Sequence, residues 1–301
     1  MPLVHWADVT DPIAVEVHAT PAPPLRPFVS SYVGFLLSGF PAGVHLGPPT
    51  RALTAVISLD DPLEVVSPDG AGVRRMAAVS AGLQTRAIAI HHGGRQHGVK
   101  VALTPLGARA VYGLPAAELA DTVVPLEDLL HALGAELLER IRAATTWDAR
   151  FRTLDELLAR AVARGARQPS AEAGVHAAVA ATYRRLVAAR GMAQVGAIAA
   201  ELGWSRRHLT ERFRAEVGVT PKTLARILRF EHAHALVTTD DPPPWAEVAT
   251  TAGYADQAHL VRDWRAFTGR TPTDWRRGEV LPAAEPRLLT SGDGAPSPRR
   301  R

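Results

Sequence analysis

The C-terminal half of the sequence contains an internal repeat, and this repeat constrains the fold more than any other feature. Residues 195–204 match residues 245–254 at an offset of 50, and residues 208–224 match residues 259–275 at an offset of 51. Seven of the aligned pairs in the second match are identical. Self-similarity at a fixed spacing indicates two copies of one small structural unit, with one residue inserted in the second copy.

Each copy has the pattern of two short helices joined by a tight turn. Gly203 and Gly253 predict the end of the first helix, because glycine tolerates the positive φ found at a helix C-terminus. Ser205 and Asp256 predict the N-cap of the second helix. Apolar residues at helical spacing form the inward face of each copy, and this pattern predicts a helix-turn-helix. The predicted structural core comprises Ile198, Ala199, Gly203, Leu209, Phe213, Gly218, Pro221, Val248, Ala249, Gly253, Leu260, Trp264, Gly269 and Pro272.

A continuous helical pattern over residues 220–238 joins the two copies. At 1.5 Å per residue, a helix of this size is about 28 Å long. Successive major-groove faces of B-DNA lie about 34 Å apart. The spacer therefore predicts that one chain places the second helix of each copy in adjacent major grooves.

The repeated motifs resemble the DNA-binding domain of the AraC/XylS family of transcription regulators over residues 176–281. The combination carries the resemblance, and its parts are Ile198-Ala199-x3-Gly203, Leu209-x3-Phe213, Gly218-x2-Pro221, Ala249-x3-Gly253-Tyr254 and Phe267-x-Gly269-x2-Pro272-x2-Trp275. The resemblance implies an all-α domain with two helix-turn-helix units that binds double-stranded DNA. It also implies a variable N-terminal domain that senses a signal or dimerises.

The second helix of each copy is expected to enter the major groove with its N-terminal, outward residues toward the bases. Leu209 and Phe213 face inward, so the residues around them point outward. Arg binds guanine bidentately, Gln suits adenine, and Glu accepts from cytosine. The predicted base-contacting residues are Arg206, Arg207, Thr210, Glu211, Gln257, His259 and Arg262. The predicted phosphate-contacting residues are Arg214, Arg265, Arg276 and Arg277.

Some of these residues keep a second interpretation. Glu211 either reads a base or pairs with Arg207, which lies four residues earlier on the same helix. His208 and His259 occupy equivalent positions, so the two share either a structural role or a DNA contact. Each arginine also fits a solvated helix face, because long charged side chains are mostly exposed.

The excess of basic side chains lies in the C-terminal half, as in a nucleic-acid-binding domain. Residues 1–165 carry 14 basic and 16 acidic side chains, whereas residues 176–281 carry 15 basic and 11 acidic ones. The absence of cysteine excludes disulfides and thiolate metal sites. No window approaches 18 consecutive apolar residues, and the N-terminus lacks a basic stretch followed by an apolar run. We therefore expect no membrane association, no signal peptide and a cytoplasmic, nucleoid-associated protein.

The N-terminal half combines short strand patterns with later helical ones. Strands are expected at 52–59, 63–66, 77–81, 87–91 and 98–103, and helices at 106–112, 126–143 and 151–162. The two longer helices have apolar stripes that fit either a core or a dimer contact, and a core is the commoner case. This pattern predicts a β-rich, barrel-like unit.

The predicted fold class is α+β, with a β-rich, sensor-like N-terminal domain followed by an all-α double helix-turn-helix domain. The expected domains are a sensor or dimerisation domain at 1–165, a linker at 166–175, a DNA-binding domain at 176–281 and a disordered tail at 282–301. Besides double-stranded DNA, the candidate partners are RNA polymerase, an unidentified small-molecule effector and a second copy of the chain.

A different class of function also fits residues 1–165. They would form a metal-dependent or ligand-binding barrel, and the DNA-binding domain would be an accessory to it. His91, His92 and His97 lie close in sequence, but adjacent strand residues point to opposite faces, which argues against a shared metal ion. No nucleophile motif, acid–base pair or phosphate loop is recognised, so we expect no enzyme, no cofactor and no metal site.

Overall fold

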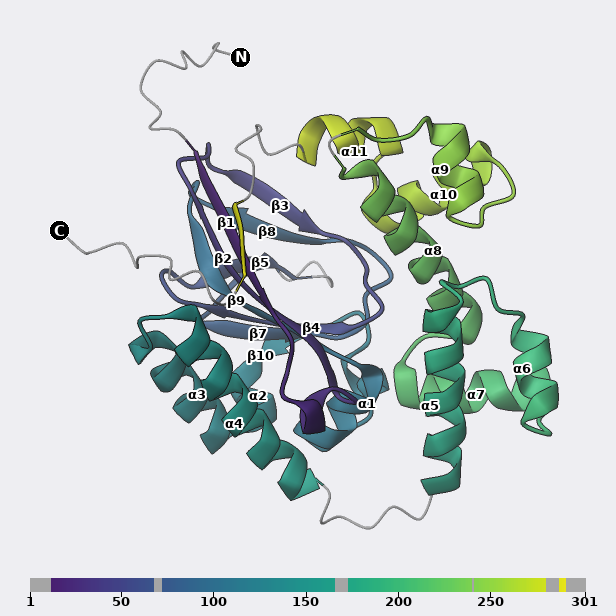
Figure 1. Ribbon diagram of the computed structural model, residues 1–301, viewed down its shortest axis with the longest axis horizontal. Coiled ribbons are helices and arrows are strands. Elements are labelled where there is room, and N and C mark those ends of the chain that lie inside the picture. The colour runs from purple at the N-terminus through teal and green to yellow at the C-terminus, as the bar shows by residue number, and fades with distance from the viewer. Residues whose placement is uncertain (1–11, 68–71, 166–172, 240, 280–286, 291–301) are drawn as a thin grey trace.

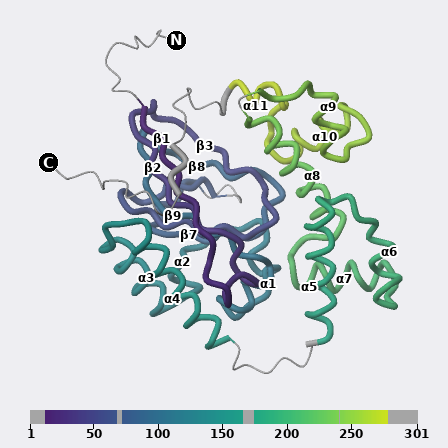
Figure 2. Tube along the Cα trace, in the orientation of Figure 1, coloured from purple at the N-terminus to yellow at the C-terminus, as the bar shows by residue number. Residues whose placement is uncertain are grey.

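The computed structural model describes residues 12–67, 72–165, 173–239, 241–279 and 287–290 (Figure 1). Strands dominate the N-terminal half and helices form the C-terminal half, a path that Figure 2 traces along the chain. This arrangement confirms the predicted α+β fold class.

Two β-sheets form the N-terminal unit. The larger sheet has the spatial order β10 (Val123–Pro125), β7 (Ala78–Ala81), β4 (Leu53–Ser58), β9 (Gln96–Leu103), β2 (Val29–Ser38), β1 (Ile13–Ala19) and β11 (Arg287–Thr290). The smaller sheet has the order β3 (Gly43–Gly47), β8 (Ile88–His92), β5 (Leu63–Val66) and β6 (Val73–Met76). Val65 of the smaller sheet and Val79 of the larger one share a buried cluster, so the sheets enclose a common interior.

The five predicted strands correspond to β4, β5, β7, β8 and β9, whereas β1, β2, β3, β6 and β10 were not predicted. In β2, Tyr32 and Val33 are both buried although they lie on opposite faces. A strand buried on both faces shows no polar–apolar alternation, and periodicity alone does not identify it. Within the predicted tail, the structure describes β11, which pairs in parallel with β1. The rest of 282–301 lies outside the described residues.

Helices α2 (Leu126–Leu130), α3 (Ala132–Ala143) and α4 (Trp147–Gly165) cover one face of the larger sheet (Figure 1). Phe151 of α4 stacks on Tyr32 of β2 with ring centroids 5.9 Å apart. The apolar stripes of α3 and α4 belong to this buried core rather than to an exposed seam. The predicted single helix at 126–143 is wrong, because the chain breaks at His131, whose φ is 53°. Leu130 and Leu133 stay buried on either side, so the apolar stripe runs through the break.

Short helical segments complete the N-terminal unit, namely η2 (Pro23–Leu25), α1 (Pro105–Gly107), η3 (Ala108–Tyr112) and η4 (Ala116–Leu119). The C-terminal unit consists of α5 (Ala173–Ala188), α6 (Val195–Glu201), α7 (Arg206–Val217), α8 (Pro221–Val237), α9 (Trp245–Thr251), α10 (Gln257–Thr268) and α11 (Pro272–Glu279). Helix α5 begins inside the predicted linker. None of the described helices has the length and apolar character that a membrane span requires.

The first three helices of the C-terminal unit share one hydrophobic core with the β-rich unit, since Leu209 and Phe213 cluster with Leu119 and Val111. Helices α9, α10 and α11 instead pack with the second half of α8 in a separate aromatic core. The spacer helix α8 therefore crosses from one core to the other.

Glu231 of α8 lies where the two units meet. Its Oε1 accepts the backbone N–H of Arg51 at 2.9 Å, and the hydroxyl of Tyr183 donates to the carbonyl of the same arginine at 3.1 Å. Burial raises the pKa of the Glu231 carboxyl and outweighs the opposing effect of Arg51. An ionised Glu231 carboxylate therefore lowers the stability of the folded protein.

Replacing Glu231 by glutamine is expected to stabilise the protein at pH 8, because an amide oxygen still accepts from Arg51 while the buried charge disappears. The expected rise in Tm is about 2–4 °C, as about 1 kcal/mol produces in a domain of this size. A carboxyl whose pKa is raised on folding destabilises the fold above that pKa, so the difference should vanish as the pH falls toward the unfolded value. Thermal unfolding of both proteins from pH 5 to pH 8 measures the difference in Tm. A Glu231→Gln variant less stable than the wild type at pH 8 would show that the ionised carboxylate stabilises the fold.

Candidate nucleic-acid interface

The repeat folds into two helix-turn-helix units with matching elements, α6–α7 and α9–α10. Gly203 and Gly253 end the first helix of each unit with φ of 69° and 78°. The turns also share a hydrogen bond, from Trp204 N to Ala199 O in one and from Tyr254 N to Ala249 O in the other, both 2.9 Å. The residues that the repeat aligns thus occupy equivalent places.

The recognition helices α7 and α10 are capped in the same way. Ser205 Oγ accepts the N–H of His208 at 3.1 Å, and Asp256 Oδ1 accepts the N–H of His259 at 2.6 Å. An N-cap of this kind contributes about 1 kcal/mol to helix stability. At the other end, Gly218 and Gly269 cap the helices in the left-handed conformation.

All apolar members of the predicted core are buried, and its glycines have positive φ. The buried members are Ile198, Ala199, Leu209, Phe213, Pro221, Val248, Ala249, Leu260, Trp264 and Pro272. Burying the inward face leaves the opposite face of α7 and α10 to the solvent, where a duplex can reach it.

The outward residues of α7 begin at its N-terminus. The Arg207 side chain is 89% exposed and pairs with Glu211, itself 58% exposed, at 2.8 Å. Arg206 instead folds back across α6, so that a Cβ placed on Gly196 would lie 2.7 Å from its Nε. Thr210 is half-buried and donates its hydroxyl to the carbonyl of Arg206. Arg207 and Glu211 are thus open to solvent on this face of α7.

In α10, Gln257 and Arg262 are exposed. His259 is half-buried, with its ring edge-on to Tyr254 at 5.1 Å. His208 meets Trp204 in the same way at 4.6 Å. The two histidines therefore have matching ring contacts within their own units, which favours the structural one of their two interpretations.

The four arginines predicted to contact phosphates, Arg214, Arg265, Arg276 and Arg277, are all exposed. Among them, the guanidinium of Arg276 lies 5.3 Å from the ring centre of Trp245. A guanidinium stacked on an indole keeps its N–H groups available at the ring edge, so this position remains compatible with a phosphate contact.

Sequence reasoning missed a buried ion pair behind α10. Arg226 of α8 donates from Nε and Nη2 to Asp263 Oδ1 at 3.0 and 2.8 Å. The Asp263 side chain is 7% exposed, so the pair fixes α10 against the spacer helix. An acidic residue between the inward-facing Leu260 and Trp264 was the available signal, because a buried carboxylate requires a partner.

Sequence reasoning also missed the contacts between the β-rich unit and the recognition helices. Arg109 of η3 donates from Nε and Nη2 to the two carboxylate oxygens of Glu216 at 2.8 and 2.7 Å. Glu216 lies in the last turn of α7 and is buried. The N–H of Ala87 donates to the carbonyl of Phe267, in the last turn of α10, at 2.7 Å. The β-rich unit thus touches both recognition helices at their C-terminal ends.

An apolar cavity of about 90 Å³ lies between the two sheets. Its walls are mostly aliphatic and come from both sheets, with Val56 and Val79 on one side and Val65 and Ile90 on the other. Gln84 also lines it and is buried, with its Nε2 donating to the carbonyl of Thr122 at 2.9 Å. The lining suits a small apolar molecule better than a charged one.

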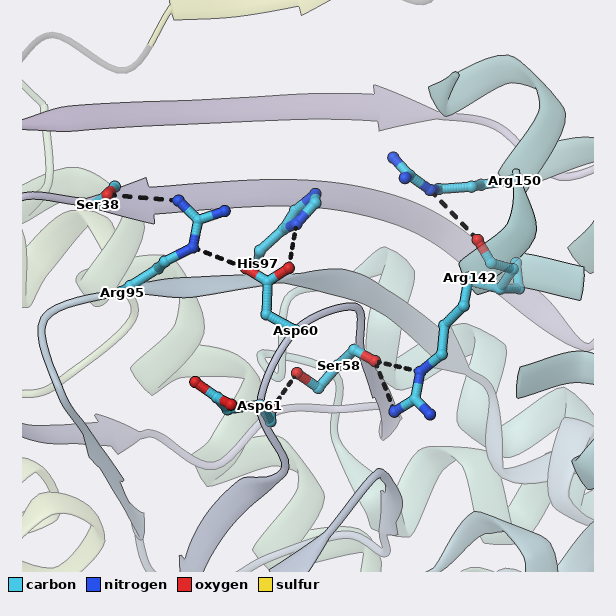
Figure 3. Close-up of polar contacts among 9 residues, drawn as sticks. Ser38, Ser58, Asp60, Asp61, Arg95, His97, Arg142 and Arg150 are labelled. Carbon is cyan, nitrogen blue, oxygen red and sulfur yellow. Dashed lines mark hydrogen bonds and ion pairs between the residues drawn. The ribbon is translucent and has the colours of Figure 1, made fainter. Parts of the chain in front are cut away.

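A polar opening also lies in the same unit. Figure 3 shows the polar contacts of Asp60, Arg95 and His97, which line it. Asp60 pairs there with Arg95 at 2.7 Å and with His97 at 3.2 Å. Burial raises the pKa of the Asp60 carboxyl, but the hydrogen bonds with Arg95 and His97 outweigh it and leave the pKa below its ordinary value. Burial lowers the pKa of His97 despite that carboxylate. Asp60 is therefore hydrogen-bonded to both Arg95 and His97 at this opening.

The three histidines that lie close in sequence all line this opening, but they come from two different strands. His91 and His92 follow each other on β8, while His97 lies on β9 of the other sheet. His92 Nδ1 accepts the N–H of Gly94 at 3.2 Å. Across the described ranges, no three His, Asp or Glu side chains are grouped closely enough to hold a metal ion.

A family comparison matched the C-terminal part of the chain, and a comparison of structures matched most of the chain. A family described as a helix-turn-helix domain matches residues 198–278. No curated protein matches the sequence. A ligand-free point variant of ToxT from Vibrio cholerae overlaps with a TM-score of 0.50 at 9% identity, covering 82% of this chain and 97% of that one, which indicates a shared fold.

Other solved structures overlap more loosely. Wild-type ToxT from Vibrio cholerae with a bound unsaturated fatty acid has a TM-score of 0.47 at 8% identity, covering 89% of this chain and 96% of that one. The AraC-like transcriptional activator CuxR has a TM-score of 0.28 at 17% identity, covering 68% of this chain and 76% of that one. The family match and the geometry of the two units identify the C-terminal part of the chain as an AraC-type helix-turn-helix domain.

Proposed function

We propose that the protein is a non-enzymatic, cytoplasmic transcription regulator that binds a specific double-stranded DNA sequence through α7 and α10. The observation that carries this proposal is the repeated geometry of the two units, whose recognition helices are joined by the continuous helix α8. With 17 residues, α8 is about 26 Å long, a suitable spacer for two successive major grooves. RNA polymerase and a second copy of the chain are the further partners in this proposal.

Within α7, Arg207 and Glu211 are the proposed base-reading residues, and within α10 the proposed ones are Gln257 and Arg262. The ion pair between Arg207 and Glu211 does not oppose this role. An exposed pair four residues apart on a helix contributes only about 0.3–0.5 kcal/mol, whereas a bidentate contact of Arg with guanine contributes about 1–3 kcal/mol of discrimination. DNA can therefore release Arg207 from its partner.

Selection from a pool of random duplexes tests the DNA-binding proposal. The purified full-length chain should enrich one sequence, and a shuffled version of that sequence should bind about 10³-fold more weakly or worse. Equal affinity for the enriched and shuffled duplexes would contradict sequence-specific binding. Binding at different salt concentrations should accompany the comparison, because phosphate contacts weaken with salt whatever the sequence.

We further propose that a small, largely apolar effector binds in the cavity between the sheets and alters DNA binding. The lining residues support the choice of ligand class. The position of the cavity supports the regulatory role, because its wall residues Gly82 and Gln84 lie only a few residues before Ala87, which contacts α10.

Indole and benzene are suitable probes for this cavity. Each should raise the Tm of the wild type, because a ligand that binds only the folded state stabilises it by mass action. The variant Val79→Phe fills the cavity and should lose the shift, whereas Val44→Phe, at an exposed position on β3, should keep it. A shift of equal size in the wild type and in Val79→Phe would place the probe elsewhere, and no shift in the wild type would remove the support for an apolar effector.

A further inference from the structure

The two recognition helices are held from the same side. Their N-terminal ends carry the exposed residues Arg207 and Gln257, whereas their C-terminal ends face the β-rich unit. Figure 1 shows α7 and α10 approaching that unit at two separate places. The residues that make or support these contacts come from two loops of the β-rich unit, 82–87 and 116–122, together with Arg109 of η3, and we call this set the bracket.

The bracket meets α7 at the turn that ends this helix. A Cβ placed on Gly218 would lie 2.7 Å from the Cβ of Ala120 and 3.0 Å from the Cα of Ala117, so the turn lies flat against η4. Next to it, the ion pair of Arg109 with Glu216 is bidentate and its carboxylate is buried. His176 of α5 lies 3.7 Å from the same carboxylate. This end of α7 is therefore fixed by close packing and by charge.

The bracket meets α10 through its other loop. The N–H of Ala87 donates to the carbonyl of Phe267, a group in the last turn of the helix that has no partner within the helix itself. The ring of Phe267 lies in the buried aromatic core of the second unit. A short hydrogen bond to such an anchored residue fixes the axial position of α10.

The two loops of the bracket are tied to each other, and Asp121 is the centre of the tie. Its Oδ1 accepts from the backbone N–H of Thr85 at 2.6 Å and from the Thr85 hydroxyl at 2.9 Å. Its own N–H donates to the carbonyl of Leu83 at 3.0 Å. Asp121 adopts a φ of 53°, a conformation that few residue types accept readily. The contacts to α7 and α10 thus belong to one connected element.

Inside the helical unit, the two helix-turn-helix copies are joined by α8 and by a contact between Met192 and Gly253. A Cβ placed on Gly253 would lie 2.9 Å from the Met192 Cγ. The bracket adds a connection at the C-terminal ends of the recognition helices. We propose that the bracket sets the separation and angle between α7 and α10, so that Asp121, Arg109 and Ala87 are positioning residues for reading DNA. This inference uses the proposed DNA binding, but its first test needs no DNA.

Spin labels on the two recognition helices measure their separation directly. The chain has no cysteine, so Ala215→Cys and Ala266→Cys, at equivalent exposed positions of α7 and α10, give two unique labels. The doubly labelled protein without further substitutions should give one narrow distribution of the distance between the two labels. Asp121→Gly removes the carboxylate without straining a positive φ and should broaden it about twofold or more. Asp121→Asn keeps an acceptor oxygen for Thr85 and should restore the narrow distribution.

Asp61→Gly removes an exposed carboxylate elsewhere on the β-rich unit and should change nothing. An Asp121→Gly distribution as narrow as that of the wild type would overturn the proposal and leave α8 and Met192 as the determinants of spacing. Thermal unfolding checks that each variant is folded. If Asp121→Gly does not fold, Ala87→Pro gives the same test from the other side, because it removes the N–H that binds Phe267.

DNA with altered spacing provides the second readout. One base pair inserted between the two boxes of the selected site moves the second groove by about 3.4 Å along the axis and about 35° around it. The wild type should lose about tenfold or more in affinity on this insertion, whereas Asp121→Gly should lose about threefold or less. A merely structural role of Asp121 would lower affinity for both duplexes equally. Failure to select any DNA would contradict the proposed function, while the spin-label distances would still decide the role of the bracket.

Discussion

Replacing Arg207 by alanine is expected to weaken binding to the selected DNA by about 5- to 150-fold, equivalent to about 1–3 kcal/mol. The reason is geometric. Arg207 lies in the first turn of α7 with its side chain 89% exposed, and a recognition helix directs these N-terminal residues at base edges. Affinity for random DNA should change by about twofold or less, because that affinity depends mainly on phosphate contacts. Titration of both duplexes at one salt concentration measures the difference.

Arg265→Ala is the matched control, because Arg265 is an exposed arginine in the last turn of α10. It should weaken binding to the selected and random duplexes alike and lower the salt dependence by about one unit of slope. Equal losses on both duplexes for Arg207→Ala would remove Arg207 from the base-reading set. A gain in binding for Arg207→Ala would likewise contradict the assignment.

Replacing Trp264 by alanine is expected to destabilise the second helix-turn-helix unit by about 3–5 kcal/mol. Trp264 is fully buried, and its ring meets those of Phe230 at 5.0 Å, Trp245 at 5.9 Å and Trp275 at 6.4 Å. Because α9–α11 have a core of their own, the loss should leave the β-rich unit and the first unit folded. Urea unfolding followed by circular dichroism should then show a separate transition at low denaturant.

The same variant should change the footprint on DNA. Protection by the second unit should disappear while protection by the first remains. The equivalent change in the first unit, Phe213→Ala, removes a side chain from the core that the first unit shares with the β-rich unit, so we expect one broader loss of structure. A Trp264→Ala variant with a single transition at the wild-type midpoint would contradict the division into two cores.

The helix-turn-helix units could be predicted from the sequence because their signals are local. Gly203 and Gly253 end helices, and Ser205 and Asp256 begin the next ones, each within a few residues of the feature they specify. The repeat then doubles every signal. The break at His131 is less clearly marked, since Gly134 follows it by three residues while the leucine spacing continues through it.

Contacts between distant segments were not predictable in the same way. Arg109 and Glu216 are separated by 107 residues, and no spacing rule relates them. Charged residues on inward helix faces were the only indication, as for Glu216 before Val217 and Asp263 before Trp264. Such a residue predicts that a buried partner exists, but a single sequence does not reveal which residue it is.

Guanine-methylation interference on the selected duplex tests the central claim most directly, because N7 of guanine lies in the major groove. The full-length chain should show two groups of sensitive guanines about 10–10.5 base pairs apart, both on one face of the duplex. Arg207→Ala should abolish sensitivity in one group and leave the other. A single group, or two groups on opposite faces, would contradict the account in which α7 and α10 of one chain read adjacent major grooves.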